Sequence, residues 1–162
     1  AMSFIQDSGG MYLVSDPVTE DQIIRLASDI LKSRLLTTDV LSSPALTRQF
    51  LQTKLAPYNR EVFAVLFLTA QHQVIRYEEM FQGTLDGAAV YPREVVKRAL
   101  EVNASAVILS HQHPSGMSEP SAADRRITER IVSAMSLVDI RVLDHIVVGC
   151  TDTYSFAEHG VL

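Results

Sequence analysis

The chain has 162 residues, of which 47% are hydrophobic and 20% charged, a composition typical of a globular domain with a substantial core. Its net charge of −5 argues against direct, salt-driven binding to nucleic acid, which needs a basic face. No apolar run approaches the roughly 18 residues of a membrane span, no secretory leader pattern is visible, and a single cysteine excludes an internal disulfide, so we expect a cytoplasmic protein without a membrane segment.

The first 57 residues are expected to form an N-terminal arm and a helical appendage. Residues 1–18 contain two adjacent glycines and no sustained apolar period, with a short strand expected at Met11 to Val14. Apolar residues then recur at helical spacing from Thr19 onward, and the run Ser43 to Lys54 predicts a second helix. The apolar faces of both helices favour packing on the domain that follows, with a partner-binding lobe as the alternative.

Residues 58–162 predict a unit in which strands and helices alternate. Val62 to Thr69 has the length and composition of a buried strand, and Val74 to Met80 returns as its hairpin partner. A turn-rich loop is expected between Gly83 and Gly87. The remaining expected elements are a helix at Arg93 to Val102, a strand at Ala106 to Ser110, a helix at Ser121 to Leu137, and strands at Ile140 to Val148 and Tyr154 to Phe156. This alternation predicts a mixed α/β fold.

A histidine pair follows the third expected strand of this unit. The sequence reads His111-Gln-His113-Pro, and residues two apart in an extended chain point to the same side, so both imidazoles can reach one ion. Pro114 and Gly116 then end the strand, and Asp124 follows in the first turn of the next helix. Two histidines and a carboxylate leave a fourth position open on a tetrahedral zinc ion, an arrangement typical of catalytic sites.

Simpler explanations of the same residues stay open at the level of the motif. A His-x-His pair by itself is a weak signal for a metal. Ser121-x-x-Asp124 also fits a capping box at a helix N-terminus, which explains both residues without any ligand role. The close succession of two histidines, a turn and a carboxylate favours the metal site.

These strings resemble a known family. His111-Gln-His113-Pro-Ser-Gly followed by Pro120-Ser-x-x-Asp124 is similar to the JAMM motif of the MPN+ (JAB) metallopeptidases, in the form used by the RadC branch. The other stretches similar to that branch are Phe81-Gln-Gly-Thr84, Tyr91-Pro-Arg-Glu94 and Leu143-Asp-His145-Ile-Val-Val-Gly149, within a resemblance that covers about Arg60 to Leu162. The resemblance implies a three-layer, cytidine deaminase-like MPN/JAB domain at residues 58–162, with a mixed sheet flanked by helices, beside the helical appendage at residues 1–57.

The resemblance also implies a zinc-dependent metallopeptidase or isopeptidase whose peptide or isopeptide substrate is unidentified. The implied zinc ligands are His111, His113 and Asp124, with the family's spacing of 11 positions from His113 to Asp124. Glu61 is implied as the general base that activates a metal-bound water. Ser121 is implied as the hydroxyl that stabilises the developing oxyanion.

Two assignments near the site have alternatives. Glu78 and Glu79 are rivals to Glu61 as the general base, since strand alternation sends them to opposite faces and one of them could point inward. Glu61 is preferred because it opens the first buried strand in the family context Arg-Glu-x-Phe. His145, within an apolar strand, is either a core histidine or a support for a ligating imidazole.

The wider function also has alternatives. RadC relatives carry a DNA-repair label, although the acidic charge makes direct nucleic-acid binding unexpected. A metal-bearing scaffold without turnover is another alternative, and the sequence leaves the oligomeric state open, a homo-oligomer included. Cys150 follows the apolar run Ile146 to Val148 and is expected to be buried and inert.

Overall fold

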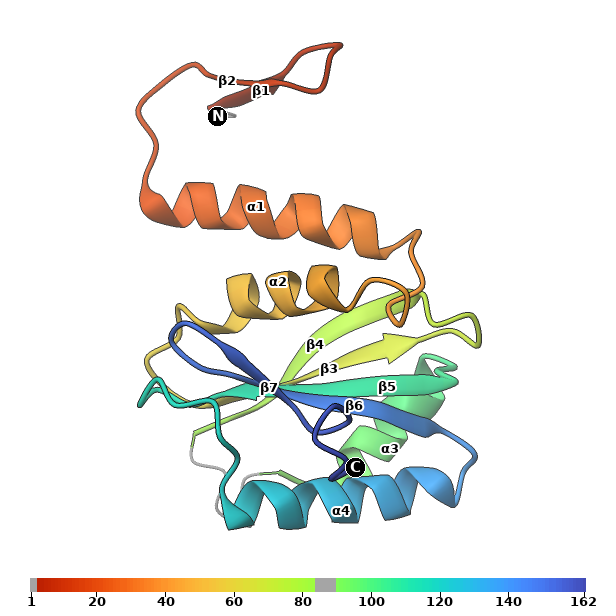
Figure 1. Ribbon diagram of the computed structural model, residues 1–162. Coiled ribbons are helices and arrows are strands. Elements are labelled where there is room, and N and C mark those ends of the chain that lie inside the picture. The colour runs from red at the N-terminus through yellow and green to blue at the C-terminus, as the bar shows by residue number, and fades with distance from the viewer. Residues whose placement is uncertain (1–2, 84–89) are drawn as a thin grey trace.

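A mixed β-sheet forms the centre of the molecule in the computed structural model, which describes residues 3–83 and 90–162 (Figure 1). The strands lie in the order β4-β3-β5-β6-β7, and neighbouring strands are antiparallel except for the parallel pair β5 and β6. Their bounds are β3 Val62–Leu68, β4 Val74–Gln82, β5 Ala106–Gln112, β6 Arg141–Val148 and β7 Thr153–Ser155. A separate antiparallel pair, β1 (Phe4–Gln6) and β2 (Tyr12–Val14), precedes the first helix.

Helices cover both faces of the sheet, as Figure 1 shows. On one face lies α2 (Pro44–Leu55), with α1 (Glu20–Leu35) outside it, and on the other lie α3 (Pro92–Glu101) and α4 (Ala122–Ser136). This arrangement of helices, mixed sheet and helices confirms the predicted fold class. In the part of the chain that the structure describes, no helix combines the length and apolar character needed to cross a bilayer.

Side-chain alternation along the central strands produces two cores. The residues of β3 that face α3 and α4 are Phe63, Val65 and Phe67, and those that face α2 are Ala64, Leu66 and Leu68. Strand β5 repeats this pattern, and its Val107 and Leu109 belong to the α3 and α4 side. Because His111 and His113 follow at the same two-residue spacing, alternation directs both imidazoles to the face that α4 covers.

The predicted elements are present with small differences at their ends. Strand β5 extends two residues beyond its expected end, to Gln112, so that His111 lies within the strand. The arm contains an unpredicted strand, β1, because three residues are too few to show a period. Most of the loop expected between Gly83 and Gly87 lies outside the described residues.

Helix α2 is part of the core of the sheet. Phe50, Leu51 and Leu55 are buried in one cluster with residues of β3, β5 and β6. Helix α2 therefore packs on the sheet, as its apolar face predicted, and α1 packs on α2. The domain boundary between residues 57 and 58 stays a prediction.

The prediction that Cys150 is buried is wrong. Its side chain is exposed, because β6 ends at Val148 and the chain turns before β7 begins. The backbone N–H of Cys150 donates to the Gly116 carbonyl at 2.8 Å. The residue therefore contacts the loop after the histidine pair through its main chain, with its thiol toward solvent.

Candidate metal centre

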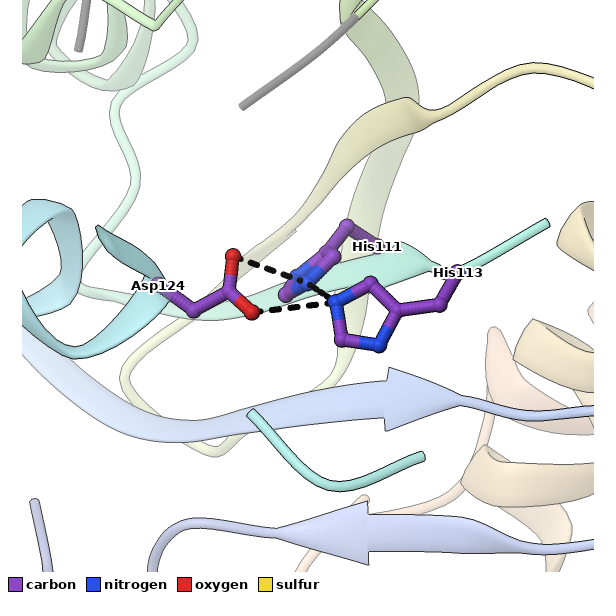
Figure 2. Close-up of side chains that lie close together, drawn as sticks. All are labelled: His111, His113 and Asp124. Carbon is purple, nitrogen blue, oxygen red and sulfur yellow. Dashed lines mark hydrogen bonds and ion pairs between the residues drawn. The ribbon is translucent and has the colours of Figure 1, made fainter. Parts of the chain in front are cut away.

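Three side chains from β5 and α4 converge at one end of the sheet. His111 is buried near the end of β5, and His113 lies one residue beyond the strand, where its N–H donates to the Val148 carbonyl at 3.2 Å. Asp124 is 1% exposed and lies in the first turn of α4. Figure 2 shows both imidazoles and the carboxylate pointing toward one another. The structure therefore brings together the three residues that the sequence predicted as ligands.

The distances between the ligand atoms fit a single ion. His111 Nε2 lies 3.0 Å from His113 Nε2 and 3.3 Å from Asp124 Oδ1, and His113 Nε2 lies 3.0 Å from Asp124 Oδ2. Ligand atoms about 2.0–2.1 Å from a tetrahedral zinc ion lie about 3.3 Å from one another by geometry. The distances from nitrogen to nitrogen and from each nitrogen to its nearer carboxylate oxygen are close to this value, so the group can hold a metal ion.

Asp124 is fixed by the start of α4 as well as by the histidines. Its Oδ2 accepts a hydrogen bond from the Ser121 N–H at 2.8 Å, and its own N–H donates to Ser121 Oγ at 3.1 Å. This capping box leaves the carboxylate facing the imidazoles, so capping and metal binding are compatible. Burial opposes ionisation of Asp124, but its contacts with the imidazoles of His111 and His113 hold its pKa well below the usual range of a carboxyl group.

The hydrogen bonds of His113 determine which ring nitrogen faces the site. Its Nδ1 lies 2.7 Å from the Met117 carbonyl oxygen, which can only accept, so Nδ1 carries the proton and donates. Nε2 therefore presents a lone pair to the centre. The contact with Asp124 raises the pKa of His113, whereas burial lowers the pKa of His111.

Glu61 lies beside the two histidines, on the same side of the sheet. In the β3–β5 register Phe63 pairs with His111, and the same register continued by two residues sets Glu61 opposite His113. The negative charge of Glu61 acts to raise the pKa of both imidazoles, which fits a carboxylate close to them. Its role as a general base stays a prediction.

Gln112, between the two histidines, ties the start of β3 to the end of β5. Its side chain is 2% exposed, and its Oε1 accepts from the Val62 N–H at 2.8 Å. Its Nε2 donates to the Arg60 carbonyl. The two bonded residues flank Glu61, so Gln112 sets the position of that segment relative to the histidine pair.

The rival carboxylates are engaged elsewhere. Glu78 accepts from Arg98 of α3 at 2.8 and 2.6 Å, and this hydrogen bonding lowers the pKa of Glu78. Glu79, on the opposite face of β4, accepts from the hydroxyls of Tyr58 and Tyr77 at 2.5 and 2.8 Å. As predicted, the alternation of side chains along β4 places Glu78 and Glu79 on opposite faces of the sheet. None of the residues that donate hydrogen bonds to them belongs to the metal centre.

Ser121 is exposed at the N-terminus of α4, next to the centre. Its oxygen accepts the Asp124 N–H, but a hydroxyl that accepts one hydrogen bond can still donate its own proton. Helix capping therefore does not prevent Ser121 from donating to a substrate oxygen.

Two residues of the centre had no assigned role at the sequence level. Gln112 could have been found from its position in the strand. It lies between His111 and His113, so its side chain must point to the opposite face of the sheet. Thr128 could have been found from its spacing, because it lies one helical turn after Asp124 and its hydroxyl donates to the Asp124 carbonyl at 2.7 Å. His145 is buried and lies 2.7 Å from His111, so it belongs to the core and contacts a ligand at the same time.

Comparison with known families fits this geometry. The family model described as a RadC-like JAB domain matches residues 41–161. The chain belongs to this family. The match to the RadC-like JAB domain confirms the resemblance and begins at residue 41, so that it includes α2 as well as the sheet and the metal centre.

Relatives of this RadC-like JAB domain differ in length. Two UPF0758 proteins of Vibrio cholerae are 56% and 53% identical over 143 and 151 residues, which are 88% and 93% of this chain and 90% and 95% of the relatives. A UPF0758 protein of Cellvibrio japonicus is 56% identical over 140 residues, 86% of this chain but 62% of that relative. The RadC-like JAB domain of the longer relatives is thus accompanied by further chain.

Proposed function

We propose that the chain is a zinc-dependent hydrolase of amide bonds, a metallopeptidase or isopeptidase of the cytoplasm. The observation that carries the proposal is the convergence of His111, His113 and Asp124 at distances that suit one zinc ion. Two imidazoles and a carboxylate are a set of ligands typical of catalytic zinc sites. Such sites keep the fourth coordination position for water. Bound zinc supplies a Lewis acid that lowers the pKa of water to about 7.

The other polar groups near the centre have the chemistry that amide hydrolysis requires. The Glu61 carboxylate accepts a proton from the attacking water and returns it to the leaving nitrogen. The Ser121 hydroxyl donates to the carbonyl oxygen of the scissile amide as negative charge develops there. Proximity of Glu61 to the histidines supports a hydrolase over a scaffold that binds metal without turnover.

Exposure indicates the side from which substrate reaches the centre. The side chain of His113 is 13% exposed, whereas those of His111 and Asp124 are 0% and 2% exposed. A scissile amide therefore approaches past His113, and the buried walls of the site exclude bulk water from the opposite side. An extended peptide or an isopeptide-linked chain lies along a nearby edge strand of the sheet, where main-chain hydrogen bonds hold it.

A cleavage assay with matched carboxylate variants tests the proposal. The zinc-loaded wild type, Glu61→Gln and Glu78→Gln are compared on a peptide library and on isopeptide-linked substrates. Glu61→Gln is expected to keep its zinc and lose about 10²- to 10⁴-fold in cleavage rate, whereas Glu78→Gln cleaves like the wild type. Undiminished cleavage by Glu61→Gln would remove Glu61 from the mechanism, and a zinc-loaded wild type that cleaves nothing would favour the scaffold.

A further inference from the structure

We propose that His145 is a positioning residue of the metal centre, which, together with Thr128, fixes the tautomer and orientation of His111. This inference rests on the proposed metal centre. His145 lies in β6 opposite Leu109 of β5, with a side chain fully buried on the face covered by α4. Its Nε2 lies 2.7 Å from His111 Nδ1, and its Nδ1 lies 2.6 Å from Thr128 Oγ1.

The direction of each hydrogen bond follows from the number of protons available. Thr128 Oγ1 lies 2.7 Å from the Asp124 carbonyl oxygen, which can only accept, so the single hydroxyl proton of Thr128 is used there. Thr128 Oγ1 must then accept from His145, which places the imidazole proton of His145 on Nδ1. Burial favours the neutral form of His145, which has one N–H, so its Nε2 is an acceptor.

The consequence for the ligand follows directly. Because His145 Nε2 accepts, His111 Nδ1 must donate, and His111 is held as the Nδ1–H tautomer. Its Nε2 then presents a lone pair to the centre, as zinc ligation requires. With the opposite tautomer of His145, His111 would carry its proton on Nε2 and could not bind an ion there.

The ring of His145 is also held in place by its neighbours. Phe156 stacks on it at a centroid distance of 4.7 Å and an angle of 17°, and Phe63 meets it edge-on at 5.6 Å. Asp144 accepts from the His145 N–H at 2.7 Å and from the Ala157 N–H at 2.9 Å, which ties β6 to the turn carrying Phe156. These contacts account for the Asp-His sequence within an otherwise apolar strand.

The hydrogen bonds form a chain that joins two of the three ligands. Thr128 on α4 bonds to the main chain of Asp124 and to His145, and His145 bonds to His111. His111 Nε2 lies 3.3 Å from Asp124 Oδ1, so the two ligand atoms at the ends of this chain both face the centre. One hydroxyl thus couples a ligand on β5 to a ligand on α4, so its loss is expected to loosen the geometry between them.

Zinc affinity of substituted proteins tests this role without any substrate. Thr128→Val removes the hydroxyl at nearly constant shape, and Thr128→Ser restores it. His145→Phe removes both ring nitrogens but keeps a ring for the stacking contact. Chelator competition is expected to show zinc affinity reduced about 10- to 100-fold in Thr128→Val and His145→Phe, with Thr128→Ser close to the wild type. The double variant should lose no more zinc affinity than the single variant that binds zinc more weakly. Both substitutions interrupt the same chain of hydrogen bonds to His111.

Ser110→Ala is the matched control. Ser110 also carries a fully buried hydroxyl, which donates to the Ile146 carbonyl at 2.7 Å between the same two strands, but it lies on the other face of the sheet. Its zinc affinity is expected to equal that of the wild type. If Ser110→Ala and Thr128→Val lost zinc affinity equally, the loss would reflect a general effect on folding and would overturn the proposal.

Spectroscopy gives a readout that a purely structural role would not move. Long-range 15N–1H NMR spectra of the zinc-loaded wild type are expected to show His145 protonated at Nδ1, and an Nε2–H tautomer would overturn the proposal even if His145→Phe failed to fold. Wild-type zinc affinity retained by Thr128→Val would overturn it as well. A wild type that binds no zinc would overturn the metal centre together with this inference.

Discussion

Replacing Gln112 by methionine is expected to destabilise the protein and to disturb Glu61. The substitution keeps the length of the side chain but removes its donor and its acceptor. The Val62 N–H then loses its partner at a residue that is 0% exposed, so water cannot replace the hydrogen bond. The Arg60 carbonyl belongs to an exposed residue and can be hydrated.

The loss of stability depends mainly on the Val62 N–H, because water can reach the Arg60 carbonyl but not this buried donor. A buried donor left without a partner costs about 1–3 kcal/mol, and the hydrated carbonyl adds little. We therefore expect Gln112→Met to lower the free energy of unfolding by about 1–3 kcal/mol, with each kcal/mol lowering Tm by about 2–4 °C for a chain of this size. Since Glu61 lies between the two residues released, the cleavage rate should fall more than zinc affinity does.

Urea unfolding of the zinc-free protein measures the loss, with Gln71→Met as the matched control. Gln71 is exposed in the turn between β3 and β4, so the same chemical change there should alter the free energy of unfolding by no more than about 0.5 kcal/mol. Equal stability of Gln112→Met and Gln71→Met would refute the argument that Gln112 joins the two strands.

Two further predictions concern the ligands and the opposite core. Zinc ligation needs neutral imidazoles and Asp124 raises the pKa of His113, so zinc affinity measured by chelator competition should fall as the pH drops from about 8 to about 5; a constant affinity would count against ligation by histidine. Leu51→Ala empties a fully buried site of α2 on the far face of the sheet, and should lower the free energy of unfolding by about 2–5 kcal/mol without changing zinc affinity. Urea unfolding measures the effect of Leu51→Ala. A decrease in the free energy of unfolding below about 1 kcal/mol would contradict this prediction.

Much of the site could be predicted from sequence because its determinants are local. The two histidines share a face through the two-residue period of a strand, and Asp124 is placed by the same capping box that starts α4. The apolar run that begins at Val62 also predicted a buried strand, and every residue of β3 from Val62 to Leu68 is buried.

The remaining features depend on long-range register. His145 meets His111 across 34 positions only through the parallel pairing of β5 with β6, and that pairing shifts register between Val107 and Ile108. Such an irregularity leaves no trace in the apolar pattern of either strand. Cys150 was misplaced for a related reason, because the apolar run before it does not reveal that the chain leaves the sheet after Val148.

Zinc content per chain, measured by elemental mass spectrometry on the wild type and on His113→Ala, tests the central claim most directly. The geometry of His111, His113 and Asp124 predicts close to one zinc per wild-type chain and close to none in His113→Ala, since two ligands remain in place of three. A wild type without zinc, or a variant that keeps its full complement, would contradict the assignment of this cluster as the metal centre.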